Sequence, residues 1–270
     1  MGEWTFDPVQ VAPILLVAVA YALRARTLTR RGPAVPKRRV ALFAIAIVLL
    51  LAAVVSPVAE LGEERFSFHM VQHLLLGDLA PLALLAGLTG PLLRPVLALP
   101  PAQWVRPLTH PFVALPLWTL NLYLWHLPFA YDAAIRHEPV HALEHTCFFT
   151  AGILMWAPVL ETLPQPQWFG TGAKLAYIVA VRLVSTLLAN VFLWSGEVFY
   201  APYANVGLSD QAAAGAVMMI EGSVVTMAAI AWLFLRMFGE GELRQQLLES
   251  GHDPRAVERA VRYGRADELS

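Results

Sequence analysis

The chain has 270 residues and a formal net charge of −1, and 57% of its residues are hydrophobic while only 14% are charged. Because a soluble domain carries roughly 25% charged residues, this composition excludes an ordinary soluble protein and indicates a membrane protein. The near-neutral charge gives no indication of nucleic-acid binding, and the single cysteine, Cys147, excludes an intrachain disulfide framework and a CxxC metal-binding motif.

Seven apolar stretches follow one another along the chain. Each is long enough, at about 1.5 Å per residue, to cross a hydrocarbon core roughly 30 Å thick. Segments rich in proline and glycine, such as GPAVP and LPQPQWFGTG, separate the stretches and are typical of turns. We therefore predict an all-α protein whose transmembrane domain, residues 1–238, contains seven helices near residues 8–26, 40–58, 66–88, 111–131, 139–160, 174–198 and 211–238.

The distribution of lysine and arginine predicts the orientation of these helices. Sixteen of the 19 basic residues lie in the first, third and fifth connections or after the last helix. The intervening connections hold only Arg65 and Arg136, and Arg182 lies within a predicted helix. Because connections rich in Lys and Arg stay in the cytoplasm, we expect the N-terminus outside the cell and a charged cytoplasmic tail at residues 239–270.

Six of the eight histidines reach the extracytoplasmic face in this topology. Two lie four residues apart in FHMVQHLLLGD, one lies in WHLPFAYD, and three lie in HEPVHALEHTC, where they share about a third of the helix circumference with a glutamate. Imidazoles four residues apart lie on successive turns and can reach one metal ion. We predict metal ligands at His69, His73, His126, His137, His141 and His145.

A second set of residues is expected to support these ligands. The glutamate of the histidine stripe is placed to orient an imidazole as a hydrogen-bond acceptor. The seventh helix has a polar stripe of its own, and methionine sulfur favours Cu(I). The predicted supporting residues are Glu144, Asp132, Asp210, Gln211, Met70, Met218 and Glu221.

Other polar and aromatic residues are expected to have structural roles. Arg182 needs an anion inside the membrane, which Asp78, Glu197 or Glu221 can supply. Asp78 is expected to be a hydrogen-bonding partner between helices. Tyr200 and Tyr203 fall near a predicted helix end, where residues of an interfacial aromatic belt are found.

Ligand type leaves the metal open, because imidazole binds copper, zinc, iron and nickel. An interhelical hydrogen-bond network is the alternative to a metal site. A zinc-dependent hydrolase with Glu144 as general base is a further alternative, but the sequence contains neither GxSxG nor HExxH. We expect a protein that is not an enzyme.

Three blocks of the sequence resemble the signature blocks of the bacterial CtaG-type family, which is tied to Caa-type cytochrome c oxidase. They read FHMVQHLLLGDLAPLALL, LWHLPFAYDAAIRHEPVHALEHTCFFTAGILMWAPVL and DQAAAGAVMMIEG. The resemblance implies a seven-helix protein of the bacterial plasma membrane that assists assembly of the haem–copper oxidase. The signature positions are the six histidines, Tyr131-Asp132, Asp210 and Gln211.

From the residues and the resemblance together, we expect an assembly factor that binds copper through the histidines and assists its delivery to the oxidase. Cytochrome c oxidase subunits are the expected partners, with copper chaperones as further candidates. The alternatives are a haem- or quinone-binding redox protein with paired histidines around an iron porphyrin, and a copper permease in which Asp78, Arg182 and Glu221 line a path across the bilayer. Zinc and haem therefore remain open beside copper.

Overall fold

The computed structural model describes residues 8–32, 34–100 and 106–263, so the ends of the predicted transmembrane domain and tail, 1–7 and 264–270, lie outside the described residues. The described chain contains helices and no strands, as predicted. The elements are α1 (Pro8–Arg31), α2 (Lys37–Val55), α3 (Pro57–Glu64), α4 (Phe66–Leu74), η1 (Leu75–Leu79), α5 (Ala80–Gly87), α6 (Gly90–Leu97), α8 (Pro111–Trp125), α9 (Pro128–Arg136), α10 (Glu138–Leu160), α11 (Thr171–Trp194), η2 (Ala201–Tyr203), α12 (Leu208–Glu249) and α13 (Pro254–Tyr263).

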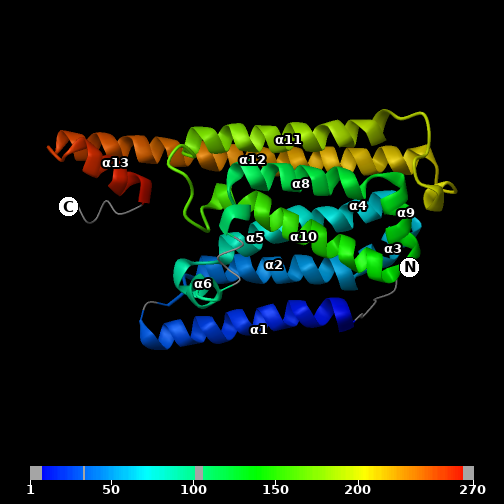
Figure 1. The fold of residues 1–270 in the computed structure, drawn as a ribbon, viewed down its shortest axis with the longest axis horizontal. Helices are drawn as coiled ribbons and strands as arrows, with labels where there is room; N and C mark the ends of the chain where they lie inside the picture. Colours follow the sequence, from blue (N-terminus) through cyan, green and yellow to red (C-terminus); the bar gives the residue numbers. More distant parts are fainter. Residues whose placement is uncertain (1–7, 33, 101–105, 264–270) are drawn as a thin grey trace.

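The long helices run side by side in one bundle (Figure 1). Six helices in the described part of the chain are long and apolar enough to cross a membrane: α1, α2, the continuous span Phe66–Gly87, α10, α11 and α12. The start of α1 lies at the end of the bundle that carries α3 and α9, whereas α13 lies at the opposite end (Figure 1). The protein is therefore a polytopic all-α membrane protein, and which end faces the cytoplasm stays a prediction.

Proline explains where two helices end. The predicted span 111–131 is divided into α8 and α9, and Leu127, which precedes Pro128, has an extended conformation with φ −70° and ψ 136°. Ser56, before Pro57, is extended in the same way and ends α2. A proline ring disfavours the α conformation in the residue before it. With 15 residues α8 covers about 22 Å, and it packs against α10 and α11, so the count of seven spans stays a prediction.

The last helix is longer than the sequence indicates. It continues through the predicted boundary at residue 239 and ends at Glu249, and α13 follows after a short turn. Its first turn is fixed to other parts of the bundle by Asp210 and Gln211. The Asp210 carboxylate accepts hydrogen bonds from the Ser67 amide (3.3 Å) and the Ser67 hydroxyl (2.5 Å). A free N–H in the first turn of α4 thus finds its acceptor on α12.

Gln211 holds the connection between α11 and α12. Its side-chain oxygen accepts from the Phe199 amide at 2.9 Å, and its amide nitrogen donates to the Glu197 carbonyl at 2.9 Å. The side chains of Asp210 and Gln211 are both buried. Asp210 and Gln211 thus position helices, and their predicted role as supporting residues of a metal site stays a prediction.

Helix α10 approaches the π-helical turn η1 through two glycines. A Cβ at Gly152 would collide with the Gly77 carbonyl oxygen and lie 2.9 Å from Pro81 Cγ. Pro81 is four residues after Gly77 and has no N–H to donate to that carbonyl. The wider π turn occurs at this point in the span. Such turns are found where the regular pattern of α-helical hydrogen bonds is interrupted.

The other end of α10 is fixed by ion pairs. Glu161, just beyond the helix, has left-handed backbone angles (φ 53°, ψ 40°). Its carboxylate lies 2.8 Å from Lys174 Nζ of α11 and 2.8 Å from Arg236 Nη1 of α12. Burial alone would raise the pKa of Glu161, but the two cations outweigh burial and hold this pKa below its usual range.

Gly152→Ala should destabilise the protein by about 1–3 kcal/mol, because the added methyl group forces α10 away from η1. Gly239→Ala is the matched control, since a Cβ at this helical position meets nothing within 4 Å. Thermal unfolding of both variants in detergent measures the difference. Equal stability of the two variants would contradict the close approach.

Glu161→Gln should lower stability at neutral pH and lose its effect in acid. A carboxylate whose pKa is depressed in the folded state stabilises the fold above its unfolded pKa, about 4.3. That contribution disappears as the pH falls through the lower folded value. The unfolding temperatures of wild type and variant, measured across a pH series, should therefore converge on acidification. A difference in unfolding temperature that stays constant with pH would show that the Glu161 ion pairs do not cause that difference.

Candidate metal centre

Three buried side chains converge in the part of the bundle where α4 faces α10. Glu144 Oε2 lies 3.8 Å from His69 Nε2 and 3.6 Å from His73 Nε2, and one ligand atom from each of the three residues lies within 4.8 Å of the others. Two ligands that each lie about 2 Å from one ion are about 3–4 Å apart. The two distances from Glu144 Oε2 to the histidine nitrogens are longer than a hydrogen bond. They match the distance between two ligand atoms that bind one ion.

The histidines of each pair lie where helical spacing predicts. The rings of His69 and His73 have centroids 4.2 Å apart, and those of His141 and His145 are 4.1 Å apart. The two pairs face each other across the α4–α10 interface, with 5.5 Å between the rings of His69 and His141 and 5.7 Å between those of His73 and His145. Helical periodicity therefore identified four imidazoles that the fold brings together with Glu144.

Glu144 has a more central place than the sequence indicated. It was expected to orient one imidazole from outside the ligand set, but its carboxylate faces both histidines of α4. Its side chain is fully buried. We therefore count Glu144 as a candidate ligand together with His69 and His73.

His137 is the one predicted ligand that lies apart. It is the residue before α10, with extended backbone angles (φ −132°, ψ 106°). Its side chain is exposed, and among the described residues no ring contact joins it to the other histidines. The helical spacing on which its assignment depended begins one residue later, at Glu138.

His126 enters the site from α8 and meets Met70. Its Nδ1 lies 2.6 Å from the Leu122 carbonyl oxygen, and its Nε2 lies 3.5 Å from Met70 Sδ. A carbonyl only accepts, so Nδ1 carries the hydrogen, and Nε2 of the neutral ring presents a lone pair. The thioether of Met70 has no hydrogen to donate. An unprotonated imidazole nitrogen and a soft thioether sulfur that face each other are a donor pair that suits copper.

The polar atoms of the cluster have no hydrogen-bonding partners among the described residues. Nine buried atoms of the cluster have no partner in the part of the chain that the structure describes. They are the two ring nitrogens of each of His69, His73 and His145, Nε2 of His141, and the two carboxylate oxygens of Glu144. Each unpartnered buried group costs about 1–3 kcal/mol, and native structures leave few of them. Direct hydrogen bonds between these side chains therefore do not account for the cluster, whereas a bound cation with water would provide partners.

Three tyrosines pack beside the histidines. The rings of Tyr131 and Tyr200 stack with centroids 3.9 Å apart, and Tyr131 lies 5.0 Å from His69. Tyr200 donates to the His126 carbonyl at 2.8 Å, and Tyr203 donates to the Gly62 carbonyl at 2.7 Å. All three are buried. The prediction of Tyr200 and Tyr203 as interfacial residues was wrong, because the α11–α12 connection folds inward and its sequence carries no periodic signal of this.

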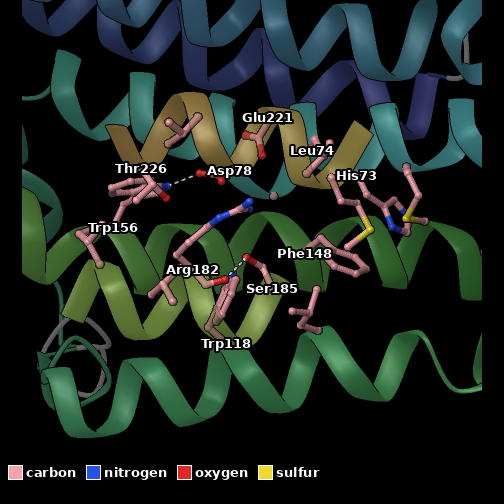
Figure 2. A pocket seen from close by; sticks show the side chains of 18 of the residues that line it. His73, Leu74, Asp78, Trp118, Phe148, Trp156, Arg182, Ser185, Glu221 and Thr226 are labelled. Atoms are coloured by element: carbon pink, nitrogen blue, oxygen red, sulfur yellow. Dashed lines mark hydrogen bonds between the residues drawn. The ribbon is translucent and has the colours of Figure 1, made fainter. Parts of the chain in front are cut away.

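The remaining predicted residues lie farther out or deeper. Asp132 lies on α9 and pairs with Arg136, with 3.6 Å between Oδ2 and Nη2. Met218 is buried and, with Met70, His73 and His126, lines one part of a cavity of about 70 Å³. Glu221 lines the same cavity deeper in the bundle (Figure 2). Cys147 is a free thiol outside the group of converging ligands.

Comparisons with known proteins identify the family of the chain. Residues 19–240 match the family described as cytochrome c oxidase caa3 assembly factor. The chain is 24% identical over 196 residues to proteins of Mycobacterium bovis and Mycobacterium tuberculosis and 23% identical to one of Mycobacterium leprae, all named uncharacterized proteins. Each match covers 66% of this chain and 29% of the relative, so the chain spans less than a third of those proteins. No solved structure matches the chain. The family match covers most of the sequence and all the converging histidines, and the chain therefore belongs to the caa3 cytochrome c oxidase assembly factor family.

Proposed function

We propose that this membrane protein assists assembly of a caa3-type cytochrome c oxidase by holding copper at the histidine cluster and passing it on. Family membership supports the role in oxidase assembly. The observation that carries the copper assignment is the set of unpartnered ligand atoms around Glu144, together with the facing Nε2 of His126 and Sδ of Met70.

Charge favours a monovalent ion at this place. Glu144 is fully buried and faces neutral donors from α4. One carboxylate neutralises one Cu(I), whereas a divalent ion would leave a net positive charge in a low-dielectric interior, which is costly. The thioether of Met70 adds a soft donor that zinc does not require.

The cluster suits a single ion better than a porphyrin. The imidazoles of α4 and α10 lie in mutual contact, with 4.1–5.7 Å between ring centroids. Paired histidines around a haem iron must leave a flat slot between them for the macrocycle. Packing of this density supports copper over the haem alternative.

The residues of the site have separable tasks in this proposal. His69, His73 and Glu144 hold the ion. His141 and His145 enclose the site from the side of α10. His126 and Met70 offer a second pair of donors, an imidazole and a thioether, at the edge of the cavity. Imidazole, thioether and carboxylate donors, without a thiolate, hold Cu(I) less firmly than a cysteine pair does, which favours release to an acceptor.

His73→Ala should lower the affinity of the detergent-purified protein for Cu(I) at least tenfold, roughly the smallest effect expected from removing a ligand. His137→Ala is the matched control, because it removes the same side chain from an exposed position just before the same cluster. Competition with a chromophoric Cu(I) chelator measures both. Equal losses in the two variants, or no Cu(I) binding by the wild type, would contradict the assignment.

Glu144→Gln should impair oxidase maturation in cells. The change keeps the shape of the side chain and removes the charge that balances the ion. In a strain lacking the native gene, the variant should yield oxidase polypeptides with reduced copper content and activity, and added copper should restore part of the activity. Glu138→Gln, an exposed carboxylate in the first turn of the same helix, should behave as wild type. Full oxidase activity with Glu144→Gln would reject the role of this carboxylate.

A further inference from the structure

A second polar site lies deeper in the bundle, at the other part of the cavity that begins beside His73 (Figure 2). Asp78 of η1, Arg182 of α11 and Glu221 of α12 line it. All three belong to segments long and apolar enough to cross the membrane. Ionisable residues in such segments are costly and are usually retained for a function.

The π turn brings Asp78 into this space. With regular α-helical spacing, Asp78 would lie about 140° around the helix from His73. The turn Leu75–Leu79 is wider, so each residue advances the chain by a smaller angle. Asp78 and His73 consequently line the same cavity. The Trp156 indole donates to Asp78 Oδ1 at 2.6 Å, which confirms the predicted interhelical hydrogen bond of Asp78.

Two carboxyl groups and one guanidinium share this space. Asp78 and Glu221 line the same cavity as Arg182, and Glu221 Oε1 is buried without a hydrogen-bonding partner among the described residues. An ionised carboxylate only accepts hydrogen bonds, whereas a protonated carboxyl group can also donate one. A proton on one of the two groups would therefore lower the negative charge in the cavity and supply a hydrogen-bond donor.

Arg182 completes the charge balance. One of its terminal nitrogens, Nη2, donates to the Met219 carbonyl at 3.0 Å and to the Ser223 hydroxyl at 2.8 Å. With a proton on one of the two carboxyl groups, the pair carries a single negative charge, which the guanidinium neutralises. With both groups ionised the site would carry a net negative charge in the membrane interior, at a large cost in free energy.

Two atoms of the site have room for water as a partner. Nη1 of Arg182 and Oε1 of Glu221 are buried and have no hydrogen-bonding partner among the described residues. The cavity of about 70 Å³ is large enough for roughly two water molecules, at about 30 Å³ each. The same cavity reaches His73 and His126, so water in it would connect the carboxyl pair with the histidine cluster.

We propose that Asp78 and Glu221 form a membrane-buried proton-binding site, with Arg182 as the counter-charge and cavity water as the path to the histidines. The charged and titratable groups that line this space are Asp78 from η1, His73 from α4, His126 just after α8, Arg182 from α11 and Glu221 from α12. From α10 the neutral side chains of Phe148 and Trp156 face it. The site lies outside the set of converging metal ligands, and this proposal does not depend on which ion they bind.

Infrared spectroscopy of the full chain in detergent tests the proposal directly. At neutral pH the wild type should show the carbonyl stretching band of a protonated carboxylic acid. The band should shift after exchange into deuterated water, because the proton communicates with cavity water. Glu221→Gln and Asp78→Asn should each abolish or move this band, whereas Glu144→Gln should leave it unchanged.

The controls separate loss of the proton site from loss of the fold. Circular dichroism should show wild-type helix content in each variant, and Glu221→Asp, which restores a carboxyl group, should recover a band. A wild-type spectrum without a protonated carboxyl band at neutral pH would overturn the proposal, since both groups would then be ionised. A band lost only with Glu144→Gln, or one insensitive to deuterated water, would overturn it as well.

Discussion

A carboxylate buried between imidazoles is the constraint on which the rest of this structure depends. Glu144 has no exposed surface, faces His69 and His73 at less than 4 Å, and has no hydrogen-bonding partner among the described residues. A buried carboxylate inside a membrane protein is costly unless a partner compensates its charge. The contact of Gly152 with Gly77, the inward-facing tyrosines and the Asp210 cap on α4 all fix the two helices that meet at this carboxylate.

Regular helical periodicity made much of the fold and part of the site predictable. Apolar length located the membrane helices, and four-residue spacing identified both histidine pairs, because these residues lie inside uninterrupted helices. His137 shows where this reasoning ends. Pro139 is suited to a first helical turn, α10 begins at Glu138, and the residue before it is extended. A rotation of about 100° per residue therefore does not apply to its side chain.

Tertiary contacts account for what the sequence could not show. Asp78 lines the cavity with His73 only because a π turn replaces regular helix, and no residue pattern in LLGDL specifies that turn by itself. Tyr200 and Tyr203 face inward because of the path of the connection between α11 and α12, which Gln211 fixes from outside that connection. Glu144 was recognised as polar and well placed, but its central position depends on how the bundle brings its side chain to His69 and His73 of α4.

The hydrogen bonds between Asp210 and Ser67 have a consequence for the order of biosynthesis. Ser67 lies in the first turn of the helix that carries the first two histidines, yet its partner lies 143 positions later, in α12, which is synthesised after every helix that carries a histidine of the cluster. While the chain is being inserted, the first turn of α4 has no such cap, and the α11–α12 connection that supports His126 through Tyr200 does not yet exist. The histidine cluster therefore lacks these supporting contacts until α12 and the connection before it have joined the bundle.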